Sequence, residues 1–469
     1  MNTRRDRPTR PADPTRPRRR MRWAVVLGLA SGTLWTLFED QSGRTTEVPA
    51  EPPQVIALSD LAADAPLKKR LAANRPVPKV ATAPEPEPST GWAIPAGAID
   101  PKKATLDTAG EHLVQDLPDG TRVVFTLDPK LQRVATETLA RYDVEWGAVV
   151  AIRPQTGEIL AMAEHAKGRP ELSRLSLSAA GPAASIFKVI SSAALLEHAK
   201  LSPDQEICTH GGQNKLTLYN LKANKRLDTK CETFAEALGS SNNVAFARWA
   251  DSLLTPQQLQ QTAEKFLFTR RIPFPWAVGI SQARIPFGSR LGFARAAAGF
   301  EATTLSPLHA AMITAAVGHE GKMMAPQLIA SATQNGEVVY TAAPTQLAEV
   351  LSPEHAKTLT GMLEATMTHG TGKKFFEKKG VPRLGKVRSG GKSGSLSGRH
   401  EDTRRHFSWF VALAPIDNVE VAVAALVVHG ENWTVKGAVP AREVLAAYFG
   451  NTSKAETGSD PAERDPLAE

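Results

Sequence analysis

The sequence predicts an α+β fold, in which an antiparallel sheet is flanked by helices and accompanied by a helical subdomain. Apolar stretches at 147–152 and 158–162 are separated by a turn sequence and predict a hairpin near the start of the folded part. Residues 407–414 and 419–428 predict a second hairpin near its end. Helical patterns occupy much of the chain between these hairpins. We therefore expect the early and late strands to share one sheet.

The predicted helices differ in how much of their surface is apolar. Asp128 and Pro129 are the residue types favoured at an N-cap and at the first helical position, and they begin a helix that extends to about residue 142. Residues 185–199 are apolar on nearly every side, which predicts a buried helix. Two further helices are expected, at 233–253 and 441–449.

Composition and charge divide the chain into five parts. They are a basic cytoplasmic tail at 1–22, a transmembrane signal-anchor at 23–38, a Pro/Ala-rich linker at 39–120, a folded domain at 121–450 and a disordered acidic tail at 451–469. The basic tail holds nine Arg and two Asp, so most of the formal net charge of +8 lies there. A nucleic-acid surface would need that excess on the folded part, so no nucleic-acid partner is expected.

The apolar segment 23–38 has arginines before it and the acidic residues Glu39 and Asp40 after it. It is short for a spanning helix, although Trp23 and Trp35 suit the two membrane interfaces. A cleaved signal peptide is the competing interpretation, but no small-x-small cleavage site closely follows the apolar run. We expect a single-pass anchor in the inner membrane, with the folded domain in the periplasm.

Two cysteines, Cys208 and Cys231, suit an oxidising compartment. They are too few to indicate a metal site, and no metal or other cofactor is expected. We expect a disulfide that closes the loop between them, with free thiols as the alternative.

The pattern Ser-x-x-Lys occurs twice, at Ser185/Lys188 and at Ser389/Lys392. At the start of a helix, residues three apart lie on one face, so the Lys188 amine can reach the Ser185 hydroxyl. The two glycines between Ser389 and Lys392 do not provide that geometry. A serine needs a neighbouring base to attack a carbonyl, and a buried lysine with a second cation nearby can stay neutral. Ser185 is the better candidate nucleophile.

A polar run, Gly239 to Asn243, interrupts a helical stretch. Buried polar side chains need partners, and an Asn amide can hold a substrate amide as both donor and acceptor. The spacing allows two pairings, Ser240 with Asn242 or Ser241 with Asn243. An ordinary Ser/Asn cap or turn is the alternative interpretation.

A glycine-rich segment, Gly390 to Ser395, precedes a predicted strand. Its glycines allow close approach of a ligand, Lys392 supplies positive charge, and the hydroxyls of Ser393 and Ser395 can bind a carboxylate. A phosphate-binding loop would require glycine at position 386, which is Lys386.

In this order, the three elements resemble the motifs S-x-x-K, S-x-N and K-T/S-G of the penicillin-binding-protein and serine β-lactamase superfamily. The resemblance covers most of residues 121–449 and includes TLDPKLQRVATETLARY, SSNNVAFARWA and GGKSGSLSG. It implies a β-lactamase/transpeptidase-like fold. The family's Asn-x-Ala-Phe pattern favours Ser241 and Asn243 over the other pairing.

The resemblance also implies roles for the site residues. Ser185 is expected to be acylated by a D-Ala-D-Ala stem peptide, with Lys188 as the base. Ser241 is expected to pass a proton to the leaving amine, and Asn243 to orient the peptide. Lys392 would act electrostatically. The remaining substrate-binding residues are Ser393, Gly394 and Ser395, with the backbone N–H groups of Ser185 and Ser395 as the oxyanion hole.

The implied activity is peptidoglycan D,D-transpeptidation through a serine acyl-enzyme. The expected partners are peptidoglycan stem peptides, β-lactams as inhibitors, and the membrane through the N-terminal helix. One alternative is a hydrolase of the D,D-carboxypeptidase or β-lactamase type. A β-lactam sensor or scaffold of the same fold is a third possibility.

Overall fold

The computed structural model describes residues 37–39, 45–47, 95, 97–168, 174–212, 215–300, 303–400, 403–430 and 433–450. The chain divides into two compact units, Met1–Thr82 and Ala83–Glu469. In the first unit, strands β1 (Leu37–Glu39) and β2 (Thr45–Glu47) form a two-stranded antiparallel ladder. The other helices and strands that the structure describes lie in the second unit.

The expected membrane anchor falls almost entirely outside the described residues, as do the basic tail 1–22 and the acidic tail 451–469. Leu37 and Phe38 are an exception, because their backbones pair with Glu47 and Thr46 in the β1–β2 ladder. The expectation of helix is therefore wrong for these two residues. Among the residues that the structure describes, no helix combines the length and the apolar character needed to cross a bilayer.

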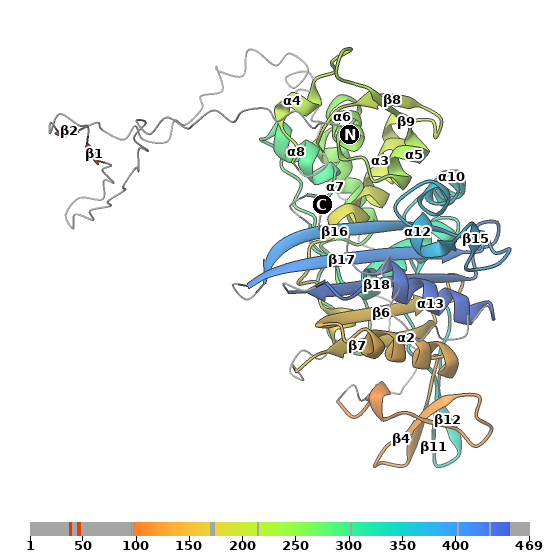
Figure 1. Cartoon of the computed structure of the whole chain (residues 1–469). Coiled ribbons are helices and arrows are strands. Elements are labelled where there is room, and N and C mark those ends of the chain that lie inside the picture. The colour runs from red at the N-terminus through yellow and green to blue at the C-terminus, as the bar shows by residue number, and fades with distance from the viewer. Residues whose placement is uncertain are drawn as a thin grey trace, which may run out of the picture. The chain divides into compact units, whose positions relative to one another are not determined.

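A five-stranded antiparallel sheet forms the centre of the second unit (Figure 1). Its strand order is β16-β17-β18-β6-β7, so the predicted early and late hairpins are joined through the β18–β6 pair. The shared sheet predicted from the sequence is confirmed. The strands are β6 (Trp146–Ile152), β7 (Ile159–Ala166), β16 (Gly390–His400), β17 (Thr403–Ala414) and β18 (Val421–His429).

Helices cover both faces of this sheet, because its inner strands are apolar on both sides. The first and last helices of the domain, α2 (Pro129–Arg141) and α13 (Ala438–Tyr448), pack on one face. Helix α9 (Pro307–Gly318) packs on the other. A hydrophobic core lies on each face of the sheet, and neighbouring strand residues alternate between these two cores. Phe410 packs on the α13 side and Val411 on the α9 side.

The helical region lies beyond β16, which is the edge strand (Figure 1). Its central helix, α3 (Lys188–Ala199), is buried and follows directly on a 3-10 turn, η4 (Ala184–Phe187). The other helices are α4 (Leu218–Leu221), α5 (Phe234–Gly239), α6 (Asn243–Leu253), α7 (Pro256–Lys265), α8 (Arg290–Ala297), α10 (Pro353–Leu363), α11 (Ala365–Thr368) and α12 (Lys373–Phe376).

A second five-stranded sheet corrects the predicted linker, which was expected to extend from residue 39 to residue 120. Strands β3 (Thr105–Leu106) and β4 (Leu113–Asp116) pair in series with β5 (Thr121–Phe125), and Val114 is buried. The chain is Pro-rich only up to about residue 103. The apolar residues that follow belong to the folded sheet. The sheet is completed by β11 (Ile329–Gln334) and β12 (Glu337–Thr341).

Short elements complete the unit. They are the 3-10 turns η2 (Pro101–Lys103) and η3 (Leu175–Leu177) and the two-stranded ladders β10 (Lys322–Met324) with β13 (Gln346–Glu349), β14 (Glu377–Lys378) with β15 (Val381–Pro382), and β8 (Glu206–Thr209) with β9 (Lys230–Thr233).

The helix predicted at 233–253 is interrupted, which corrects a second expectation. Ser241 takes a left-handed φ of 61°, which ends α5 and separates it from α6. Asn242 then caps α6, since its side-chain oxygen accepts from the N–H groups of Val244 and Ala245. Asn favours such local side-chain to backbone bonds over continuing a helix.

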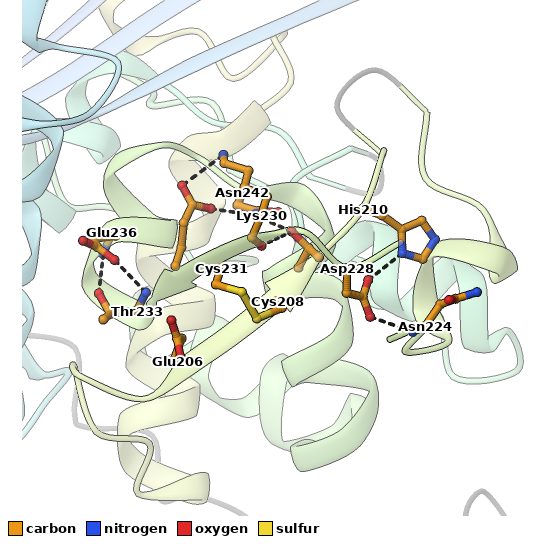
Figure 2. The surroundings of a disulfide bond; sticks show 12 residues. Glu206, Cys208, His210, Asn224, Asp228, Lys230, Cys231, Thr233, Glu236 and Asn242 are labelled. Atoms are coloured by element: carbon orange, nitrogen blue, oxygen red, sulfur yellow. Dashed lines mark hydrogen bonds and ion pairs between the residues drawn. A yellow bond between two sulfur atoms is a disulfide. The ribbon is translucent and has the colours of Figure 1, made fainter. Parts of the chain in front are cut away.

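A disulfide joins Cys208 to Cys231 across the β8–β9 ladder, where the two residues lie directly opposite (Figure 2). The Asn242 amide nitrogen donates to Thr209 Oγ1 at 3.0 Å and to Glu232 Oε2 at 2.6 Å, on residues adjacent to the two cysteines. The hairpin therefore supports the junction of α5 and α6. An isolated two-stranded hairpin is marginal in water, so the disulfide supplies stability that the ladder lacks.

We predict that replacing both cysteines, Cys208→Ser with Cys231→Ser, destabilises the hairpin and its hold on Asn242. The cysteines are 23 residues apart, and closing such a loop is worth roughly 3 kcal/mol. Hydrogen exchange by mass spectrometry should show faster exchange at 206–233 than in the wild type, and denaturant unfolding should show a lower midpoint. Reduction of the wild type should reproduce both changes. Equal exchange in the oxidised wild type and the variant would contradict the prediction.

Candidate active site

Ser185 lies in η4, the 3-10 turn that begins the buried helix. The preceding residue, Ala184, has a left-handed φ of 48°, a conformation that non-glycine residues adopt only when their surroundings impose it. A Cβ on Gly299 would stand 2.3 Å from the Ala184 carbonyl oxygen and 3.1 Å from the Ser185 nitrogen. The chain after α8 therefore presses closely on the backbone of the candidate nucleophile, and only glycine fits there.

Lys188 is completely buried, and its amine has three oxygen partners. Lys188 Nζ lies 2.9 Å from Ser185 Oγ, 2.7 Å from Asn243 Oδ1 and 2.6 Å from the Ala298 carbonyl oxygen. Burial, together with the positive charge of Lys392, holds the pKa of Lys188 well below its usual value. The structure thus brings the predicted serine and lysine together and adds a carbonyl that the sequence did not indicate.

The two pairings in the second polar run occupy different surroundings. Asn243 is the first residue of α6 and reaches Lys188, whereas Asn242 is engaged as the N-cap and by the β8–β9 hairpin. Both Ser240 and Ser241 line the cleft beside Ser185. The geometry therefore agrees with the Ser241/Asn243 pairing.

The third element lies on the edge strand β16. Lys392 is completely buried, and burial lowers its pKa to about 7. A Cβ on Gly394 would stand 3.2 Å from Ile186 Cγ1 and 3.3 Å from the Ile186 nitrogen, so the strand passes close to η4. Ser393 and Ser395 alternate with these buried residues and line the cleft.

A cleft of about 550 Å³ contains most of these groups. It is lined by Ser185, Thr209, His210, Gly211, Leu227, Thr229, Lys230, Ser240, Ser241, Asn242, Asn243, Thr371, Ser393 and Ser395. Lys188 and Lys392 lie beneath its surface. Ser389, from the second Ser-x-x-Lys pattern, is buried ahead of β16 and is absent from this lining.

Sequence reasoning missed the lining residues Thr209 to Gly211, Leu227, Thr229, Lys230 and Thr371, and it also missed Ala298 and Gly299, which contact Lys188 and Ser185 from outside the lining. Thr371 Oγ1 lies 2.6 Å from Ser393 Oγ, and its N–H donates to the Gly239 carbonyl. Ala298 contributes only a carbonyl, and Gly299 only the absence of a side chain. The segment Ala296–Gly299 is unusually rich in small residues, which was the one available signal. In the part of the chain that the structure describes, no group of three His, Cys, Asp or Glu side chains could hold a metal ion.

Comparison with known proteins places this geometry among related enzymes. The family model "Penicillin binding protein transpeptidase domain" matches residues 147–447. The "Peptidoglycan D,D-transpeptidase PbpA" of Mycolicibacterium smegmatis is 27% identical over 346 residues, which cover 67% of this chain and 68% of that protein.

Solved structures show the same fold. The D,D-transpeptidase domain of an Eggerthella lenta peptidoglycan glycosyltransferase has a TM-score of 0.59 and 23% identity, with 89% of this chain and 95% of that chain covered. The imipenem acyl-enzyme complex of penicillin-binding protein A from M. tuberculosis has a TM-score of 0.55 and 25% identity, with 70% and 79% covered.

These comparisons confirm the resemblance, the α+β fold class and the class of activity expected from the sequence. The match to the family model extends over more than half of the chain and includes all three motif segments. The chain belongs to the penicillin-binding-protein transpeptidase domain family.

Proposed function

We propose that this chain cross-links peptidoglycan stem peptides and that Ser185 is the nucleophile that carries the acyl group. The observation that supports this most directly is the surroundings of the Lys188 amine. A neutral amine has two N–H groups and one lone pair. Asn243 Oδ1 and the Ala298 carbonyl oxygen can only accept hydrogen bonds, so they take the two N–H groups.

The lone pair of neutral Lys188 is then left facing Ser185 Oγ, 2.9 Å away. In this state the serine hydroxyl donates to the lysine, which is the arrangement that general-base activation requires. A protonated Lys188 would donate to all three oxygens and leave the serine inactive. Burial and the charge of Lys392 both favour the neutral form.

The other cleft residues are suited to hold and release the donor peptide. Ser241 lines the cleft. Its proposed role is to pass a proton to the leaving amine. The Asn243 amide, anchored on Lys188, orients the peptide. Ser393 and Ser395 bind the terminal carboxylate, and Lys392 beneath them attracts it.

The backbone N–H groups of Ser185 and Ser395 are the proposed oxyanion hole. β16 is an edge strand, so alternate N–H and C=O groups along it have no partner strand on the cleft side. The close approach of Gly394 to Ile186 brings this edge near the start of the nucleophile helix. Donors fixed in this way stabilise charge that develops only in the transition state.

The proposed reaction has two steps. Ser185 Oγ attacks the carbonyl carbon of the penultimate D-Ala, the C–N bond to the terminal D-Ala breaks, and that amine leaves with a proton. The acceptor amine then attacks the ester carbon, the bond to Ser185 Oγ breaks, and the proton returns to Ser185. Attack by water instead would make the chain a carboxypeptidase or β-lactamase, and a long-lived adduct without product would indicate a sensor.

The location of the reaction is inferred from the parts of the sequence outside the described residues. We propose that the apolar segment that begins at Trp23 anchors the chain in the inner membrane and that the enzyme faces the periplasm. The charge asymmetry around 23–38 supports that orientation. The disulfide supports an oxidising compartment.

Labelling with a fluorescent penicillin tests the assignment of the nucleophile. The wild type should form a stable adduct on the peptide that contains Ser185, and Ser185→Ala should form none. Ser389→Ala is the matched control, since it removes the serine of the other Ser-x-x-Lys pattern and should keep the label. Lys188→Met should lower the acylation rate by about 100-fold or more, because the base is lost. Loss of the label in the Ser389 variant alone would refute the assignment.

The acylation rate should depend on pH in two opposing ways. It should rise with pH as Lys188 loses its proton, at a pH well below its ordinary pKa of 10.5. It should fall again as the pH rises through about 7, because Lys392 then loses the charge that attracts the ligand carboxylate. The fall approaches tenfold per pH unit if that charge is essential. The second-order rate constant for benzylpenicillin measures both limbs.

The methyl ester of the same penicillin provides the control for the alkaline limb. It lacks the carboxylate, so its acylation should fall much less above pH 7. An equal fall for the acid and the ester would show that Lys392 acts on something other than the carboxylate.

A further inference from the structure

Residues 215–230 form a lobe between the two strands of the disulfide-linked hairpin. The lobe includes α4, which lies at the outer end of the helical region, away from the central sheet (Figure 1). The disulfide closes the lobe at its base, because Cys208 on β8 and Cys231 on β9 come before and after it in the chain. We call residues 215–230 the basic lobe, for the reason given below.

Arg248 fixes the basic lobe from within. This arginine is buried on α6, and it donates to the carbonyl oxygens of Asn220 and Lys222 at 2.6 and 2.8 Å. It also donates to both carboxylate oxygens of Asp228, each at 3.0 Å. The lobe is therefore held in one shape, and the charge of Asp228 is neutralised inside it.

The outer surface of the basic lobe has an excess of positive charge. Asp228 is the one acidic residue in 215–230 of the sequence, against five Lys and Arg residues. The ion pairs that the structure describes in this segment involve Asp228 with Arg248 and Lys230 with Glu232. Four exposed cations are left on the surface: Lys215, Lys222, Lys225 and Arg226.

Large apolar side chains are exposed among these cations. Leu218 and Tyr219, both on α4, are 52% and 57% exposed. The Tyr219 ring packs edge-on against the His210 ring, with 5.2 Å between their centres, which fixes its position. Cations interspersed with leucine and an aromatic ring are typical of surfaces that lie at a membrane interface. A hydrated polyanion would pair with the cations but would gain nothing from Leu218.

We propose that the basic lobe docks on the surface of an anionic phospholipid bilayer. Its four exposed cations contact lipid phosphates, and Leu218 and Tyr219 enter the boundary between the headgroups and the acyl chains. Each cation held near such a surface strengthens binding roughly fivefold. The rigid attachment of the lobe to α6 means that docking also orients the domain.

The orientation matters because the basic lobe is also a wall of the Ser185 cleft. Leu227, Thr229 and Lys230 belong to the lobe and line the cleft. A docked lobe therefore places one rim of the cleft at the bilayer. Docking leaves the reacting groups unchanged, so it does not depend on the proposed reaction.

Hydrogen exchange of the full chain with lipid vesicles tests the proposal. The vesicles consist of phosphatidylcholine alone or of an equal mixture of phosphatidylcholine and phosphatidylglycerol. Exchange at 215–226 should be roughly fivefold slower or more with the anionic vesicles. High salt should abolish the difference, because exposed charges are screened. This segment is the readout because the arginines of residues 1–22 can bind anionic lipid by themselves.

Two variants separate the charge of the lobe from the total charge of the chain. The lobe variant is Lys215→Gln/Lys222→Gln/Lys225→Gln/Arg226→Gln. The control variant removes four exposed cations elsewhere: Lys103→Gln/Arg133→Gln/Arg141→Gln/Lys357→Gln. The lobe variant should lose the slow exchange, and the control variant should keep it. Both should form the penicillin adduct at the wild-type rate, which shows that they are folded.

The remaining outcomes identify other occupants or a failure elsewhere. Equal exchange at 215–226 with both kinds of vesicle would overturn the proposal, and so would slow exchange that persists in the lobe variant. Purified cell-wall polymer that slows exchange there more than anionic vesicles do would show that the lobe binds a polyanion instead of a bilayer. Absence of the penicillin adduct in the wild type would refute the proposed function, whatever the exchange result.

Discussion

The buried amine of Lys188 is the interaction on which the rest of the site depends. A charged lysine in this position would lose its hydration, with a penalty of several kcal/mol, so the neutral form is favoured. Its oxygen partners come from three separate segments: η4, the start of α6 and the residue after α8. Each of them must be in place for the amine to be satisfied. The fold can therefore be understood as a frame that brings these three segments to one buried nitrogen.

Much of this frame acts through the backbone rather than through side chains. Gly299 leaves room beside Ala184 and Ser185, and Gly394 leaves room beside Ile186. Ala184, which precedes the proposed nucleophile, and Ser241, which belongs to the second motif, both have left-handed backbone conformations. Strained conformations persist only where the surrounding structure over-determines them. Here that structure includes the α8 end and the disulfide-linked hairpin that holds Asn242.

The difference between side-chain and backbone contributions explains which parts of the site could and could not be predicted from the sequence. Side-chain chemistry is visible in a sequence, so Ser185, Lys188 and Lys392 could be proposed from residue type and spacing, and the structure brings Ser185 and Lys188 together. The shared sheet was predicted from two hairpins with alternating or continuous apolar strands. The Ala298 carbonyl was invisible, because every residue has one. Thr371 was missed because a lone threonine far along the chain gives no signal until the fold brings it to Ser393.

The predicted boundaries of the linker and of the helix at 233–253 were wrong for a related reason. Strands β3 and β4 were assigned to the linker because each is only two to four residues long, and no period is visible over so short a stretch. β4 pairs with β5 across a short turn, and the pairing of β5 with β11, far along the chain, becomes evident only in the fold. The polar run 239–243 did indicate a possible cap or turn within the helical stretch, but residue spacing alone could not decide between that and a continuous helix; in the structure Asn242 caps α6.

The open edge of β16 connects the fold to the chemistry. An unpaired edge strand is a liability, since it can pair with any extended chain. In this protein the edge of β16 lies close to η4 and beside the cleft. An extended chain that pairs with this edge must therefore also fit between Ser185 and Ser395. Binding a peptide as an added strand places its carbonyl against fixed N–H donors. In the proposed reaction, the feature that would promote aggregation elsewhere therefore serves to align the donor peptide.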